Sequence, residues 1–315
     1  MFTVAIGLIG ALVYGGADFF GGLAARRLRS VLVTAIAAAT GLALFLVAAP
    51  VVGGTWSAEA AGWGVLSGVF GAVSVALLYA CLAIGPMSIL SPLTALVSAV
   101  APMVWGLLVE GEDLGALGYA GIAIALVAVV LIGFIPGERI VRPTARAVVM
   151  AIGAGISIGA LLITLDQPSG DSGLVPLIAS RAANLTLMVA VIALMALVAR
   201  ARPGVSGPFA SPAAGIPYRG ALGGPAHDKS AVAAPAAVRG AVAIAVLCGV
   251  LDAAANALLL FGLRLGELAV MSVLTAMYPA GTILLAAVVL RERIAPVQWA
   301  GLVLALTAGG LFAVA

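Results

Sequence analysis

Ten apolar runs, each about as long as a membrane span, constrain the fold of this 315-residue chain more than any other feature. A helix rises ~1.5 Å per residue, so about 20 apolar residues cross a hydrocarbon layer of ~30 Å. The runs are too long for strands and do not alternate between apolar and polar residues. The sequence therefore predicts an all-α, polytopic membrane protein with ten transmembrane helices. The predicted spans are residues 2–24, 31–52, 62–84, 87–109, 115–135, 147–165, 174–199, 240–263, 267–290 and 295–314.

The composition agrees with lipid as the solvent for most of the surface. Apolar residues make up 64% of the chain and charged residues 9%, whereas soluble domains carry about 25% charged residues. The net charge of +3 and the dispersed arginines do not favour a nucleic-acid partner. Cys81 and Cys248 lie far apart within apolar runs, and the one histidine, His227, lies in a loop, so neither a metal nor a cofactor is expected.

The two halves of the chain repeat each other. The segment 79–85 matches 261–266, with the final glycines 266 − 85 = 181 residues apart, and Glu112 matches Glu292 at 292 − 112 = 180. Each half holds five spans, an odd number, so the second copy is expected to be inverted relative to the first. Inverted repeats are a transporter architecture with the substrate site between the halves. We predict repeats over 1–136 and 137–315.

A proline- and glycine-rich segment at 201–238 interrupts the second repeat. It contains six prolines among Gly, Ala and Ser, a composition typical of a flexible loop.

The stretches 83–121 and 263–301 share a common order of features. Each has a short Gly-containing turn, a helix with Ser, Thr and Pro, a Gly-Glu or Arg-Glu-Arg turn, and a Gly-rich helix. This pattern resembles the EamA-type repeat of the drug/metabolite transporter superfamily. The resemblance implies a secondary transporter that exports small polar or amphipathic metabolites by alternating access. Arg181 resembles an arginine that this family often places early in the second helix of a repeat, whereas the first half has Thr34 near that place.

Basic residues near the span ends predict the orientation. The loops after spans one, five, seven and nine carry thirteen Lys and Arg residues, and those after spans two, four, six and eight carry only Arg264. Both termini are therefore predicted outside a cytoplasmic membrane, although the resembled family usually has both inside. With two complete halves in one chain, a monomer suffices, and a homodimer is the other option.

Three charged residues lie inside the predicted spans and away from their ends: Asp18, Arg181 and Asp252. A charge at the middle of a span costs ~2.5–3.5 kcal/mol on insertion scales, so such residues are expected to face one another or an interior cavity. Arg181 and Asp252 are predicted at similar depths and are expected to approach each other. They form either a static ion pair or a substrate or proton site, and Asp18 either takes part in that site or pairs with Arg26 or Arg27.

Further polar residues share helix faces with these three or lie in the repeated helices. Their hydroxyl and amide groups either contact substrate or bond to the backbone of their own helix. Prolines 92, 102 and 279 predict kinks in the same helices. The candidates for the substrate or ion pathway are Asp18, Tyr14, Arg181, Asn184, Asp252, Asn256, Ser91, Thr94, Thr275 and Tyr278.

Two other classes of function are weighed against transport. An intramembrane enzyme needs a nucleophile and a base at the same depth, and the sequence offers no such pair, so no enzyme activity is expected. A membrane scaffold without transport would have a dry, fully packed centre. A lipid bilayer and a small-molecule substrate are the expected partners.

Overall fold

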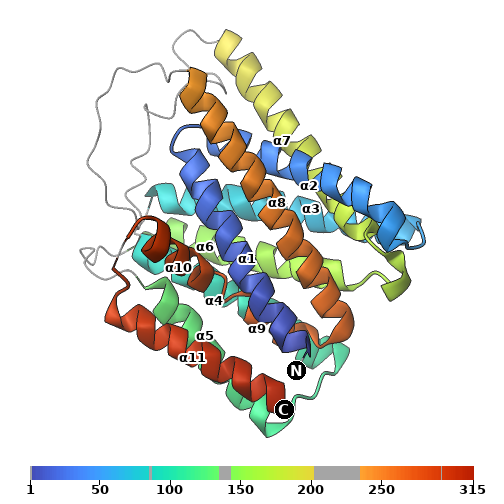
Figure 1. The fold of residues 1–315 in the computed structure, drawn as a ribbon, viewed down its shortest axis with the longest axis vertical. Coiled ribbons are helices and arrows are strands. Elements are labelled where there is room, and N and C mark those ends of the chain that lie inside the picture. Colours follow the sequence, from blue (N-terminus) through green and yellow to red (C-terminus); the bar gives the residue numbers. More distant parts are fainter. Residues whose placement is uncertain (1, 85–86, 135–142, 202–234, 292) are drawn as a thin grey trace.

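The structure, a computed structural model, describes residues 2–84, 87–134, 143–201, 235–291 and 293–315 (Figure 1). The described residues form helices and contain no strand, and ten helical segments are long and apolar enough to cross a membrane, which confirms the predicted fold class. The helices are α1 (Phe2–Ala25), α2 (Ser30–Val52), α3 (Ala58–Ile84), α4 (Met87–Trp105), η1 (Gly106–Glu110), α5 (Gly115–Gly133), α6 (Ala145–Asp166), η2 (Gly170–Ser172), α7 (Val175–Ala201), α8 (Pro235–Leu265), α9 (Leu268–Thr275), α10 (Pro279–Val289) and α11 (Pro296–Val314).

The ninth span is broken in its middle. Helix α9 ends at Thr275, and α10 begins at Pro279, whose ring nitrogen has no proton for a helical hydrogen bond. The intervening backbone forms tight turns, with Met277 N–H donating to Leu274 and Tyr278 N–H donating to Thr275. The kink predicted at Pro279 lies in this stretch, where the span changes from i→i+4 to i→i+3 hydrogen bonds. The matching helix of the first half, α4, continues as one helix through its two prolines and is followed by the π-helix η1.

Two sequence predictions fall outside the described residues. The proposed boundary between the repeats lies within 135–142, and almost all of the predicted flexible loop lies within 202–234.

Helices of the two halves pack on one another in an exchanged pattern. Helix α1 packs against α8, and its counterpart α6 packs against α3, the counterpart of α8. In the same way, α2 lies on α8 as α7 lies on α3, and α1 lies on α10 as α6 lies on α4. Three further contacts join a helix to its own counterpart: α5 to α11, α2 to α7 and α4 to α9. This is the pattern that a two-fold relation between the halves produces.

Glycines set the closest of these helix contacts. A Cβ atom at Gly249 would lie 2.8 Å from Ala37 Cα and 2.8 Å from Thr40 Cβ. At Gly68 it would collide with the Ser180 carbonyl oxygen and lie 3.0 Å from Ala183 Cβ. The glycines are 249 − 68 = 181 residues apart, and both pairs of partners are separated by 143 (180 − 37 and 183 − 40). The contact between α8 and α2 therefore repeats that between α3 and α7, residue by residue.

Substitution of Gly249 tests this helix packing directly. We expect Gly249→Ala to destabilise the protein by about 1–3 kcal/mol, because the added methyl group meets the backbone of α2, which cannot move aside cheaply. Gly240→Ala in the same helix is the matched control, since nothing lies within 4 Å of its Cβ position. Thermal unfolding in detergent measures both changes. An unfolding temperature of the Gly249 variant at or above that of the parent protein would contradict the assigned contact.

The last turn before the final helix of each half has the same backbone conformation. Gly111 has a φ of 73° and Arg291 has a φ of 56°, the only positive value at a described non-glycine residue. These positions are 180 residues apart, the offset found in the sequence around Glu112. Arginine occupies this left-handed conformation at a cost that glycine avoids.

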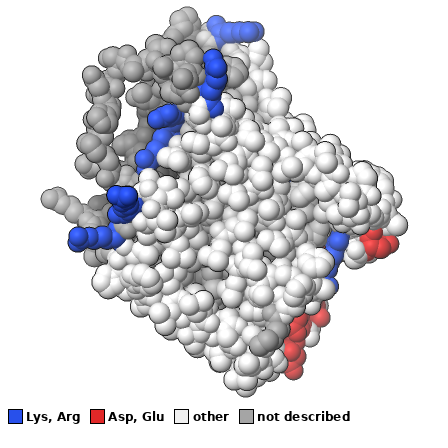
Figure 2. All heavy atoms as spheres, viewed as in Figure 1, with Lys and Arg blue, Asp and Glu red and all other residues white. Residues whose placement is uncertain are grey.

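Charged side chains gather at two opposite ends of the bundle (Figure 2). Consecutive spans run in opposite directions, so the helix bounds place the charged residues. The described basic residues next to the helix ends on one side, here called the basic end, are Arg26, Arg27, Arg29, Arg146, Arg200, Arg239, Arg291 and Arg293. The helix ends on the other side, the acidic end, carry Glu59, Glu110, Glu112, Asp113, Asp166, Asp171 and Glu267, together with Arg264. Both chain termini lie at the acidic end, where Ala315 lines a cavity with Asp113 and Glu267.

Candidate functional site

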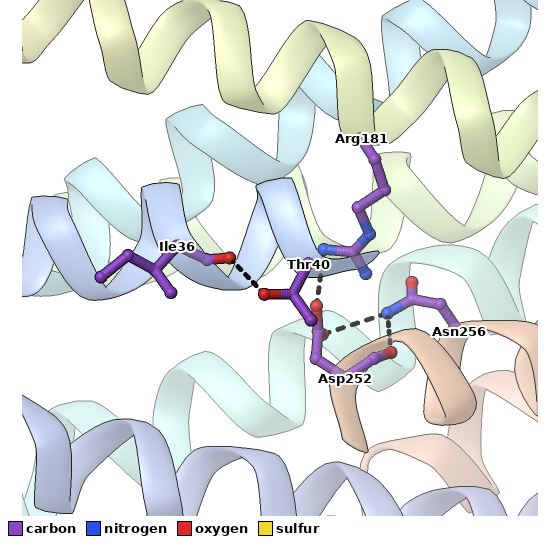
Figure 3. A network of polar contacts seen from close by, with 5 residues as sticks. All are labelled: Ile36, Thr40, Arg181, Asp252 and Asn256. Atoms are coloured by element: carbon purple, nitrogen blue, oxygen red, sulfur yellow. Dashed lines mark hydrogen bonds and ion pairs between the residues drawn. The ribbon is translucent and has the colours of Figure 1, made fainter. Parts of the chain in front are cut away.

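An ion pair between α7 and α8 lies between the two charged ends. Arg181 Nη1 is 2.6 Å from Asp252 Oδ2, and the two side chains are 13% and 22% exposed. The approach predicted for these residues is thereby confirmed. Asn256 Nδ2 donates to the other carboxylate oxygen of Asp252 at 3.1 Å and to its main-chain oxygen at 2.8 Å (Figure 3). The Asp252 carboxylate therefore has a partner for each of its oxygens.

A glycine in α2 leaves room for the guanidinium group. A Cβ atom at Gly41 would lie 3.4 Å from Arg181 Cδ and 3.6 Å from Ala253 Cβ. The preceding residue, Thr40, donates its hydroxyl proton to Ile36 in its own helix at 2.8 Å (Figure 3). Arg181 thus reaches Asp252 across a junction of α2, α7 and α8.

Asp18 faces the space between α8 and α10. On one side of it around α1, a Cβ atom at Gly21 would lie 3.1 Å from Cys248 Sγ in α8. On the other side, a Cβ atom at Gly15 would lie 2.6 Å from Gly281 Cα in α10. A helix turns ~100° per residue, so Asp18 projects between these two glycines. Its side chain is exposed and lies within electrostatic range of Asp252.

Two tyrosines accompany Asp18. Tyr14, one turn earlier on α1, reaches the Asn256 side chain with its hydroxyl and lies within electrostatic range of Asp18 and Asp252. Tyr278, at the break between α9 and α10, lies within electrostatic range of Asp18. The alternative pairing of Asp18 with Arg26 or Arg27 is not formed in the described part of the chain, whose ion pair is that of Arg181.

The remaining predicted residues divide into two groups. Thr94 is buried and donates to the Ala151 carbonyl oxygen at 3.1 Å, which ties α4 to α6. Asn184 lies against Gly71 of α3, and its Oδ1 atom is buried without a hydrogen-bond partner. Neither residue contacts the ion pair. Ser91 and Thr275 are half-buried, and Thr275 is the last residue of α9 before the break.

Sequence reasoning missed two features of this site. Cys248 packs against Ala17 and Ala37, and it also precedes Asp252 by one helical turn and lies within electrostatic range of Asp252 and Asp18. The i, i+4 spacing could have revealed it. Gly41 makes room for Arg181. The sequence could not predict this role, because no pattern in α2 indicates which helix Gly41 faces.

At the acidic end, loops of the two halves are tied together by a set of contacts that we call the outer latch, comprising Thr55, Asp171, Ser172, Gly173 and Arg264. Thr55 N–H donates to the Asp171 main-chain oxygen at 2.8 Å, and its hydroxyl donates to Asp171 Oδ2 at 3.0 Å. Arg264 Nη2 donates to Ser172 Oγ at 3.0 Å and to the Gly173 carbonyl oxygen at 2.7 Å. The latch thus joins the α2–α3 loop to the α6–α7 loop and to the end of α8.

The hydrogen bonds of the latch lower the pKa of Asp171. The causes are its side-chain hydrogen bonds with Ser169 and then with Thr55. The pKa of Asp171 is lower in the folded protein than in the unfolded chain. The ionised carboxylate therefore stabilises the fold fully at pH values above the ordinary pKa of an aspartate. This stabilisation is lost as the pH falls through the folded-state pKa.

A second contact at the acidic end joins the halves through Glu112. Its carboxylate accepts hydrogen bonds from the main-chain N–H groups of Leu268 and Ala269, the latter at 3.0 Å, at the start of α9. An acidic group at this position satisfies backbone donors that the helix leaves free. Burial, and then repulsion from Glu112 and Asp113, raises the pKa of the neighbouring Glu267. Together with the outer latch, this contact joins the two halves at the acidic end.

The chain is similar to known proteins in part of its sequence and in its fold. Residues 226–313 match the model of the EamA-like transporter family, which confirms the resemblance predicted from the repeat. The chain also matches 29 chains of solved structures. One of them, a crystal structure, covers 99% of this chain and 97% of that chain at a TM-score of 0.68 and 15% sequence identity, a likeness of fold alone. No curated protein matches the sequence.

Proposed function

We propose that this chain, whose residues 226–313 match the EamA-like transporter family model and whose described residues include ten helical segments able to cross a membrane, is a membrane transporter. On this premise, we propose that it is a secondary transporter that exports small polar or amphipathic metabolites across the cytoplasmic membrane by alternating access. The observation that carries the proposal is the Arg181–Asp252 ion pair, held within the membrane-spanning part of the bundle beside an exposed Asp18.

The energetic cost of these groups supports a functional role. Each charge placed at mid-span costs ~2.5–3.5 kcal/mol on insertion scales. A buried ion pair often contributes less to stability than apolar residues of the same size, so stability alone does not account for the pair. The break between α9 and α10 adjoins this site, and discontinuous helices are a common way of building substrate sites in transporters.

The packing of α1 supports access to the site from the basic end. Helices α1 and α10 touch at Gly15 and Gly281, but nothing lies within 4 Å of a Cβ atom at Gly22, two turns nearer the basic end. The matching position in the other half, at the offset of 143, is Leu165, which is 1% exposed. The two halves therefore differ in packing, as the halves of an inverted-repeat transporter do when one side is open.

The charge distribution supports a cytoplasmic basic end. Arginines at span ends favour the cytoplasmic side, and the described carboxylates outside the spans lie at the other end with a single arginine. Both termini would then be outside. The outer latch would close the external side in this conformation, with the site open to the cytoplasm.

Proton coupling is part of this proposal. Asp252 is held by Arg181 and Asn256, whereas Asp18 has no cationic partner among the described residues. Asp18 is therefore the better candidate for exchanging protons with solvent.

Cysteine accessibility tests alternating access without knowledge of the substrate. In a Cys81→Ala, Cys248→Ala background, we expect Thr275→Cys to react with a membrane-impermeant methanethiosulfonate added to either side, because the site would open to both in turn. Val303→Cys, 60% exposed on the outer surface of α11, is the lipid-facing control and should react far more slowly. Protection of position 275 from both sides would favour a packed scaffold over a transporter.

A further inference from the structure

Away from the ends of the spans, carboxylates outnumber cations by one. Of the three charged residues placed there by the sequence, Arg181 and Asp252 neutralise each other at 2.6 Å. Asp18 remains, with an exposed side chain and no ion pair in the described part of the molecule. The central site therefore carries a net negative charge when Asp18 is ionised.

The fold itself does not require this charge. The offsets of 143 and 181 map Asp18 to Leu161 and Asp252 to Gly71 in the other half. There, Leu161 Cδ1 would lie 3.1 Å from a Cβ atom at Gly71, an apolar contact that joins α6 to α3. The same helix junction is thus built once with two carboxylates and once with neither, where the neutral Asn184 amide lies 3.6 Å from the Cβ position of Gly71.

Two phenol rings border Asp18. Tyr14 precedes it by one turn on the same face of α1, and Tyr278, at the break before α10, lies within its electrostatic range. The Tyr278 carbonyl oxygen lies against Gly15, which flanks Asp18 on α1. A carboxylate beside aromatic rings matches a cation that has an apolar body, because ring faces attract cations and cover apolar groups.

We propose that the central site binds small organic ammonium ions with an apolar body, and that the Asp18 carboxylate pairs with the ammonium group. This inference rests on the proposed function, whose site it specifies. The Arg181–Asp252 pair presents no free cation to a carboxylate ligand, so anions of the same size are disfavoured by the net charge. A charge-assisted contact in a partly desolvated site corresponds to about tenfold or more in affinity.

A matched pair of probes tests the inference. Phenethylamine and 3-phenylpropanoate have similar apolar bodies and opposite charges. We expect the purified protein to bind phenethylamine at least about tenfold more tightly than 3-phenylpropanoate, measured by calorimetry in detergent at neutral pH. Asp18→Asn should remove this preference and Asp18→Glu should keep it. Equal or tighter binding of the carboxylate by the parent protein, or unchanged amine affinity in Asp18→Asn, would overturn the inference.

Measuring both ligand binding and solute flux separates the ammonium site from the transport proposal. The comparison of the two probes on the parent protein remains decisive even if Asp18→Asn does not fold. Phenethylamine binding that depends on Asp18, without flux of any solute in proteoliposomes, would support the site and contradict transport. Saturable flux of another solute, combined with absent ammonium binding, would overturn the ammonium site alone.

Discussion

Asp252→Asn is expected to reduce transport by about 100-fold or more, with flux measured in proteoliposomes for a solute that the parent protein carries. The change leaves Arg181 without its counter-ion within the spans, and losing one partner of a buried pair costs ~3–5 kcal/mol. The Asp252 side chain is 22% exposed, and water reduces the cost of an unpaired charge, so we expect a loss of stability of about 3 kcal/mol or somewhat less. The unfolding temperature should therefore fall together with the flux.

A double variant distinguishes a transport role from a structural one. Arg181→Met with Asp252→Leu removes both charges and replaces them with apolar side chains, which is often neutral or stabilising for a buried pair. We expect it to recover the unfolding temperature of the parent protein and to remain inactive. If the double variant transports at the parent rate, the ion pair serves only to hold the helices in register.

Locking the outer latch should reduce transport about tenfold or more. The Thr55 hydroxyl lies 3.0 Å from the Asp171 carboxylate, and their backbones are joined by a 2.8 Å hydrogen bond, so cysteines at both positions are close enough to bond. We expect the oxidised Thr55→Cys, Asp171→Cys protein to lose about tenfold or more of its flux, since the acidic end must open for external release. A reducing agent should restore the flux.

The two single-cysteine variants are the controls for the lock. Each weakens the latch without linking the halves, and the native Cys81 and Cys248 are buried, so they should not interfere. Flux that is unaffected by a fully formed disulfide would show that the acidic end does not open during transport.

Apolar spans and the repeat could be recognised without tertiary structure because both depend on residues close in sequence. Lipid demands about 20 apolar residues per helix, so span number and position follow from composition along the chain. The break at Pro279 follows equally from its missing backbone donor. The charge difference between loops likewise required only counting, and the described basic and acidic side chains gather at opposite ends (Figure 2).

Only tertiary structure decided which polar residues meet. Asn184 shares the α7 helix with Arg181 and was expected in the same site, but it lies against Gly71 of α3. Thr94 shares a repeated position with Thr275, yet its hydroxyl is used to join α4 to α6. The physical reason is that a small change in helix rotation or crossing moves a side chain to another neighbour, and the small residues that set these crossings have no polar pattern to reveal their partners.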